Sequence, residues 1–122
     1  MCRYVCLLLV SSLTACYYDN EEELFQFVEE VDCSAVVRAT FSADIEPLLI
    51  THCIRCHRNG REDGNVNLEG YDRVKPYVQN GALIGTVNHE AGWPAMPPSG
   101  VKLPPCDIEK IRLWIADGAP NN

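Results

Sequence analysis

The chain has 122 residues, among them 17 acids, 10 bases and seven cysteines, and its formal net charge is −7 at pH 7. This length accommodates one small domain, and so many cysteines in a short chain indicate export, cofactor attachment or both. Residues 19–32 carry seven of the acids and no base, so residues 33–122, with ten acids and nine bases, are nearly neutral. Because no basic patch is present, nucleic acid is not an expected partner.

Residues 1–15 have the pattern of a short secretory signal peptide. Arg3 supplies a positive start, residues 5–10 are apolar, and small or polar residues follow. The apolar run is too short to span a bilayer as a helix. The string Leu13-Thr14-Ala15-Cys16 resembles a bacterial lipobox, which implies cleavage before Cys16 and a lipid on that cysteine. Ordinary cleavage, with the cysteine there by chance, is the alternative.

Residues 16–38 are predicted to form an acidic tether between the membrane and a folded domain at residues 39–122. Acyl chains on Cys16 would anchor the protein by burying methylene groups, at about 0.8 kcal/mol each. The negative charge of the tether is expected to keep it solvated rather than to bind a partner. We therefore expect an exported protein that is lipid-anchored to the cell membrane or the outer membrane and faces the periplasm.

The folded domain is predicted to begin with a helix that leads into a cysteine motif. Apolar residues recur at helical spacing from Phe41 onward. Ser42 and Asp44 can each cap this helix. Asp44 is favoured, because Pro47 then falls in the first turn, where its missing N–H has no helical acceptor to lose.

The helix runs into Cys53-Ile54-Arg55-Cys56-His57, the most informative string of the chain. Cys-x-x-Cys-His is typical of covalent haem attachment, in which each thiol adds to a vinyl group and the imidazole ligates the iron. A single motif predicts a single haem c, with His57 as an axial ligand. Zinc is the competitor, with Cys106 or His89 as a fourth ligand. Haem is favoured, because a second paired-ligand motif is missing and the chain is expected to be exported.

The elements after the motif are less regular. A second helix is predicted from about residue 68 or 69 to Val78, whereas residues 82–87 are compatible with a helix or a turn. Five prolines in residues 92–105 exclude a regular helix or a central strand there. A last helix is predicted from about Pro105, and Gly118 would end it. The expected fold is therefore all-α, with about three helices and no strand.

Met96 is the candidate for the second axial ligand. It is the only methionine left once Met1 is removed with the signal peptide, and prolines stiffen its surroundings. A thioether opposite an imidazole raises the reduction potential of a haem. Packing in the core is the alternative role for this side chain. His89 is the rival ligand, and His52, beside the attachment motif, ranks below it.

The remaining cysteines suggest a disulfide. Cys2 and Cys6 leave with the signal peptide, Cys16 takes lipid and two more take haem. Cys33 and Cys106 are then left as an even pair in an oxidising compartment. We predict a bond between them, which would tie the start of the domain to its last helix. Two unrelated buried thiols are the alternative.

Several strings outside the haem motif carry a resemblance to a known family. They are Phe41-Ser42-Ala43-Asp44-Ile45-Glu46-Pro47-Leu48, Asn67-Leu68-Glu69-Gly70-Tyr71, Met96-Pro97 and Ile111-Arg112-Leu113-Trp114-Ile115-Ala116-Asp117-Gly118-Ala119-Pro120-Asn121-Asn122. With the haem motif, they make residues 41–122 resemble a class I c-type cytochrome domain, most closely the small haem domains of bacterial lipoproteins. The resemblance implies a cytochrome c-like fold, with long loops around one haem c.

The resemblance also implies the roles of four side chains. It puts Cys53 and Cys56 in thioether bonds to the porphyrin. It makes His57 and Met96 the axial ligands of the haem iron.

The sequence therefore predicts a lipid-anchored mono-haem electron carrier rather than an enzyme, because it shows no acid, base or nucleophile constellation. The protein could also be a redox subunit of a larger oxidoreductase complex. The expected partners are a membrane oxidase, a reductase or a periplasmic dehydrogenase. A haem-based gas sensor or a small peroxidase is the main alternative, and it requires an open or displaceable sixth position on the iron. A structural zinc-binding lipoprotein is a further alternative.

Overall fold

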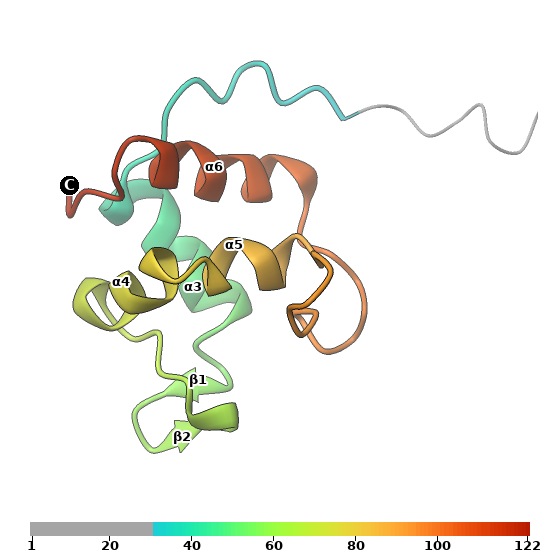
Figure 1. Cartoon of the computed structure of the whole chain (residues 1–122). Helices are drawn as coiled ribbons and strands as arrows, with labels where there is room; N and C mark the ends of the chain where they lie inside the picture. The colour runs from blue at the N-terminus through green and yellow to red at the C-terminus, as the bar shows by residue number, and fades with distance from the viewer. Residues whose placement is uncertain (1–30) are drawn as a thin grey trace, which may run out of the picture. The chain divides into compact units, whose positions relative to one another are not determined.

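The computed structural model describes residues 31–122. The predicted signal peptide, the predicted lipid site at Cys16 and most of the predicted tether lie outside the described residues. The described part is a small, mostly helical domain with four α-helices and one two-stranded sheet (Figure 1). This compact unit begins at Val31, so it includes residues 31–38, which we had expected to belong to the tether. Between residues 31 and 122, no helix is long and apolar enough to cross a bilayer.

The first helical segment begins at a different cap from the one expected. A π-helical turn, η1 (Phe41–Ile45), leads directly into α3 (Glu46–His52). Thr40 is the N-cap, and its hydroxyl accepts a hydrogen bond from the Ala43 N–H at 3.4 Å. Asp44 supports this cap from inside the turn, because its carboxylate accepts from the Thr40 N–H at 2.8 Å. The prediction of Ser42 or Asp44 as the cap was therefore wrong.

Two short strands follow the cysteine motif. β1 (His57–Arg58) and β2 (Arg61–Glu62) pair antiparallel, and the turn between them contains Gly60 at φ +80°, which glycine adopts without strain. A 3-10 turn, η2 (Asp63–Asn65), comes next. The expectation of no strand was wrong, since strands of two residues each are too short to show an alternating pattern.

Two adjacent helices cross the middle of the domain. α4 (Tyr71–Gln79) starts later than predicted, because Gly70 has φ +90° and cannot continue a helix. α5 (Ala82–Val87) settles the stretch that the pattern left open, and Gly81 at φ +80° separates it from α4. Figure 1 shows α5 between α4 and α6, and it contacts both.

The last helix matches its prediction. α6 (Pro105–Ala116) has a proline in its first turn and ends before Gly118, which has φ +89°. Residues 88–104 contain neither helix nor strand, as their prolines led us to expect. This long segment joins α5 to α6 and carries Met96.

The core is centred on Trp114, whose side chain is fully buried. Its ring centroid lies 5.7 Å from that of Phe41 and 6.5 Å from that of Tyr71. The indole N–H donates to the Pro120 carbonyl at 2.9 Å, and the Tyr71 hydroxyl donates to the Ala119 carbonyl at 2.8 Å. These two bonds tie the C-terminal residues to the aromatic cluster. The cluster includes Phe41, the first residue of η1, which continues into α3.

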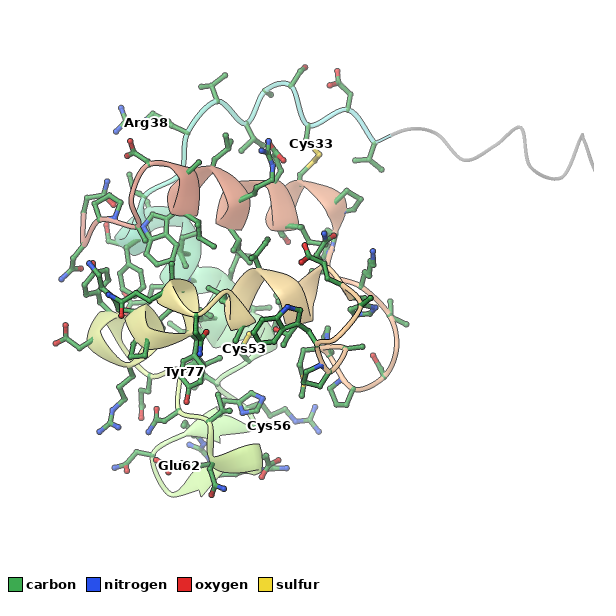
Figure 2. All side chains as sticks on the ribbon, in the orientation of Figure 1. Cys33, Arg38, Cys53, Cys56, Glu62 and Tyr77 are labelled. Atoms are coloured by element: carbon green, nitrogen blue, oxygen red, sulfur yellow. A yellow bond between two sulfur atoms is a disulfide. The ribbon has the colours of Figure 1, made fainter. Side chains whose placement is uncertain are left out.

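A disulfide joins the start of the domain to α6. The sulfur atoms of Cys33 and Cys106 are bonded at 2.06 Å (Figure 2), and they are the pair that the cysteine count left over. The bond spans 73 residues of sequence, for which the loss of unfolded-chain entropy corresponds to about 4 kcal/mol of stability. It holds residues 31–38 beside α6, which explains why the compact unit begins before residue 39.

Candidate functional site

The candidate site is a tight turn at the end of α3. The Cys53 N–H donates to the Leu49 carbonyl at 2.8 Å, so the last turn of the helix is intact up to the motif. The N–H groups of Cys56 and His57 both donate to the Cys53 carbonyl, each at 3.0 Å. Two thiols and an imidazole therefore come from one hydrogen-bonded turn that is an extension of a helix.

Cys53 and Cys56 are both free and half-buried (Figure 2). Burial raises the pKa of the Cys53 thiol to about 11, so this thiol is neutral at pH 7. A thiol–disulfide exchange enzyme would need a lowered thiol pKa instead. Cys53 is thus poorly suited to thiol–disulfide exchange, whereas both free thiols are available for bonds to another group.

One ring nitrogen of His57, Nδ1, is buried without a hydrogen-bond partner. No other buried side-chain nitrogen or oxygen atom in residues 31–122 lacks a partner. Native interiors rarely leave a polar atom unpaired, because the loss is about 1–3 kcal/mol. The backbone of His57 is fixed, since its carbonyl accepts from the Leu68 N–H at 2.9 Å and it pairs with Glu62 across the sheet. A group bound at the imidazole would account for this unpaired nitrogen.

Asn67 supports the site, and sequence reasoning gave it no role. It is buried, its Nδ2 donates to Glu62 Oε1 at 2.8 Å, and its Oδ1 accepts from the Glu69 N–H at 2.9 Å. The Glu69 carboxylate in turn accepts from the Asn59 N–H at 3.1 Å. These bonds tie the β1–β2 hairpin, and therefore His57, to the chain that precedes α4. Asn67 belongs to one of the family-like strings, but its partners are set by the fold.

Met96 lies in a separate segment that is attached to α5. Its side chain is half-buried, and its N–H donates to the Thr86 carbonyl at 3.0 Å. Its carbonyl lies 3.1 Å from His89 Nε2. Because a carbonyl only accepts hydrogen bonds, this ring nitrogen carries a proton. His89 is therefore occupied in holding the backbone of the candidate ligand, and it would have to break that bond to compete as a ligand through Nε2.

The donor set suits haem better than zinc. In residues 31–122, no three His, Cys, Asp or Glu side chains converge in a metal-binding group. Cys106, a possible fourth zinc ligand, is in the disulfide, and His89 is bonded to the Met96 segment. A structural zinc site needs four converging ligands. Haem iron needs only axial ligands from a protein, because the porphyrin supplies the rest, and the two free thiols would be available for bonds to the porphyrin.

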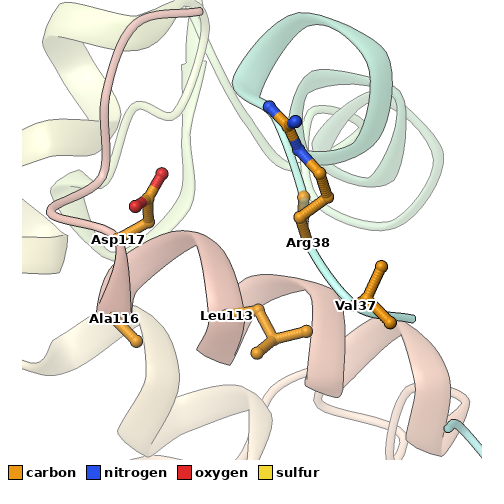
Figure 3. A pocket seen from close by; sticks show the side chains of 6 residues that line it. Val37, Arg38, Leu113, Ala116 and Asp117 are labelled. Atoms are coloured by element: carbon orange, nitrogen blue, oxygen red, sulfur yellow. The ribbon is translucent and has the colours of Figure 1, made fainter.

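One groove lies away from these residues. It has a volume of about 460 Å³ and lies between residues 37–39 and the C-terminal end of α6 (Figure 3). Its lining residues are Val37, Arg38, Ala39, Leu113, Ala116 and Asp117. None of the candidate haem ligands lines it, so it is not part of the candidate site.

Comparisons of the chain with protein-family models, with curated proteins and with solved structures found no match. The function is therefore inferred from the residues of this chain and their geometry.

Proposed function

We propose that this protein is a lipid-anchored mono-haem c-type cytochrome that carries single electrons. The observation that supports the proposal best is the turn at the end of α3. It offers two free thiols and an imidazole with an orphaned nitrogen. On this proposal Cys53 and Cys56 hold the porphyrin in thioether bonds, His57 ligates the iron, and the helical domain has a cytochrome c-like fold around the haem.

Met96 is the second axial ligand in this proposal. Its segment is held to α5 by backbone and side-chain hydrogen bonds, so the backbone that carries the thioether has a fixed position. Fixed ligands limit the movement that accompanies a change of oxidation state. The haem supplies the one-electron chemistry, while the chain supplies ligands, orientation and a low-dielectric surrounding.

The proposed role is that of a carrier, or of a redox subunit in a larger oxidoreductase complex, rather than that of an enzyme. Its partners would be a membrane oxidase, a reductase or a periplasmic dehydrogenase. A lipid on Cys16 would hold the protein at the cell membrane or the outer membrane, facing the periplasm. Such an anchor raises the local concentration of the carrier at its membrane partners.

The test of this function is a haem stain of the full chain on a denaturing gel. The chain is produced in a host with working cytochrome c maturation. Covalent haem survives denaturation, so the protein band is expected to stain, and metal analysis is expected to give one iron per chain. A colourless band, with zinc or no metal in the native protein, would refute the proposal.

Replacing Met96 with alanine tests the second ligand. The variant is expected to keep its covalent haem, to lose the ferric sulfur-to-iron charge-transfer band and to show a lower reduction potential, because a thioether ligand raises the potential. Absorption spectroscopy and potentiometry measure both effects. Val101→Ala is the control, since Val101 is an apolar residue of the same segment and is 71% exposed. An unchanged band and potential in the Met96 variant would exclude this ligand.

A further inference from the structure

His89 has a backbone conformation that is uncommon for residues other than glycine. Its φ is +55°, in the left-handed region where residues other than glycine are uncommon. In residues 31–122, the other non-glycine residues with positive φ are Asn65 at +57° and Ala119 at +49°. Asparagine and histidine enter this region more often than most other residues, but any residue except glycine is strained there and persists only where its surroundings hold it. The conformation therefore points to a role for the histidine ring.

The ring of His89 completes the hydrogen bonding of Met96. The Met96 N–H is bonded to the Thr86 carbonyl at 3.0 Å, and the Met96 carbonyl is bonded to His89 Nε2 at 3.1 Å. The His89 N–H also reaches the Thr86 carbonyl, at 3.3 Å. Both ends of the segment 89–96 thus return to one carbonyl of α5, and the imidazole closes the loop between them.

A second contact fastens the same segment to α5. The Trp93 indole packs directly on Gly85, so closely that a Cβ at Gly85 would lie 2.3 Å from Trp93 Cδ1. Only glycine permits this approach. The Glu90 N–H donates to the Gly85 carbonyl at 2.9 Å, and the Trp93 N–H donates to the Glu90 carbonyl at 3.1 Å. The contact does not involve the His89 ring, because it uses a different residue of α5, Gly85 instead of Thr86, and a different side chain.

We infer that the His89 ring and the Trp93–Gly85 contact form a latch that holds Met96 at a preset position on α5. In this arrangement His89 is a positioning residue and not a ligand. The consequence for the haem rests on the proposed function: the chain itself, and not the bond to iron alone, keeps the Met96 backbone in place, so that the thioether stays near the sixth position and slows the entry of external ligands. The latch is a property of the polypeptide and can be tested separately.

The decisive variant is His89→Gly in the full-chain holoprotein. Glycine relieves the left-handed strain and removes the imidazole together with its Cβ, so the midpoint of global unfolding is expected to stay constant or to rise. The latch is expected to fail at the same time. The Met96 amide should exchange its hydrogen roughly fivefold to tenfold faster, as for the loss of one hydrogen bond. The sulfur-to-iron band should disappear at a lower temperature than in the unmodified protein.

These two readouts separate positioning from a purely structural role, which would shift local exchange and global unfolding in the same direction. Asn65→Gly is the matched control, because it relieves a similar φ outside the segment and should leave exchange at Met96 unchanged. Gly85→Ala is a second test of the latch, since the added methyl group displaces the Trp93 ring, and it should also speed exchange at Met96.

The outcomes distinguish the latch from the proposed function. If the Met96 amide exchanges as slowly in both His89→Gly and Gly85→Ala as in the unmodified protein, the latch is overturned even when haem is bound. If the chain carries no covalent haem, the proposed function fails, but the same exchange comparison still decides the latch. Binding of carbon monoxide gives a third readout, because an intact latch should slow it and His89→Gly should accelerate it.

Discussion

Replacement of both Cys53 and Cys56 with serine is expected to abolish covalent haem. A serine hydroxyl does not form the thioether bond. Because both cysteines are replaced, no thiol remains at the motif to hold the haem. The fold of the turn should persist, because its hydrogen bonds are made by backbone groups and serine is close to cysteine in size. We therefore expect a helical but colourless protein, or its degradation before it accumulates. Haem staining and circular dichroism measure the two properties.

The second pair of cysteines provides the matched control. Cys33→Ser with Cys106→Ser also removes two sulfur atoms, but these form the disulfide on α6. That variant is expected to keep its haem stain and to lose up to about 4 kcal/mol of stability. Covalent haem at the normal level in the Cys53 and Cys56 double variant would contradict the attachment site, whatever the behaviour of the control.

Trp114→Ala is expected to lower the free energy of unfolding by about 3–5 kcal/mol, the usual range for a buried tryptophan. The side chain is fully buried against Phe41 and Tyr71, so its removal leaves a cavity at the centre of the core. The Pro120 carbonyl also loses its donor. Such a loss is a large share of the roughly 5–15 kcal/mol that stabilises a small domain. Urea denaturation followed by circular dichroism measures it.

Two milder variants show which part of Trp114 matters. Trp114→Phe keeps the aromatic contacts and removes the indole donor, so it should cost about 1–3 kcal/mol. Ile50→Ala removes an apolar side chain that is 61% exposed on α3, and it should cost about 0.5 kcal/mol or less. A loss below about 1 kcal/mol in Trp114→Ala would show that Trp114 does not centre the core.

The candidate attachment motif could be identified from the sequence because all its members lie within five residues, Cys53–His57. The bounds of α6 were predictable for the same reason. Its first-turn proline and the glycine after its end act on residues within one turn of the helix ends. The same reasoning also excluded regular structure around Met96, since prolines forbid helical hydrogen bonds wherever they stand. The disulfide pairing followed from counting, because the predicted signal peptide, lipid site and haem site accounted for the other cysteines.

Other features depend on partners that no local pattern reveals. Thr40 rather than Asp44 became the cap, because the Thr40 hydroxyl accepts from the Ala43 N–H while the Asp44 carboxylate accepts from the Thr40 N–H. The hairpin after the motif was missed because its strands are too short for a pattern, and Asn67 secures it from outside the loop. The compact unit begins at Val31 and not at residue 39, because the Cys33–Cys106 disulfide holds residues 31–38 next to α6.

The sequence by itself determined the chemistry of the candidate site, since thiols, imidazole and thioether are fixed by residue type and their order by the chain. Only the tertiary structure decided their surroundings. It left His57 Nδ1 without a partner, and it bonded the His89 ring to the Met96 carbonyl. The physical reason is range: spacing and propensity act over a few residues, whereas burial and hydrogen-bond partners depend on which distant segments the packed core brings together.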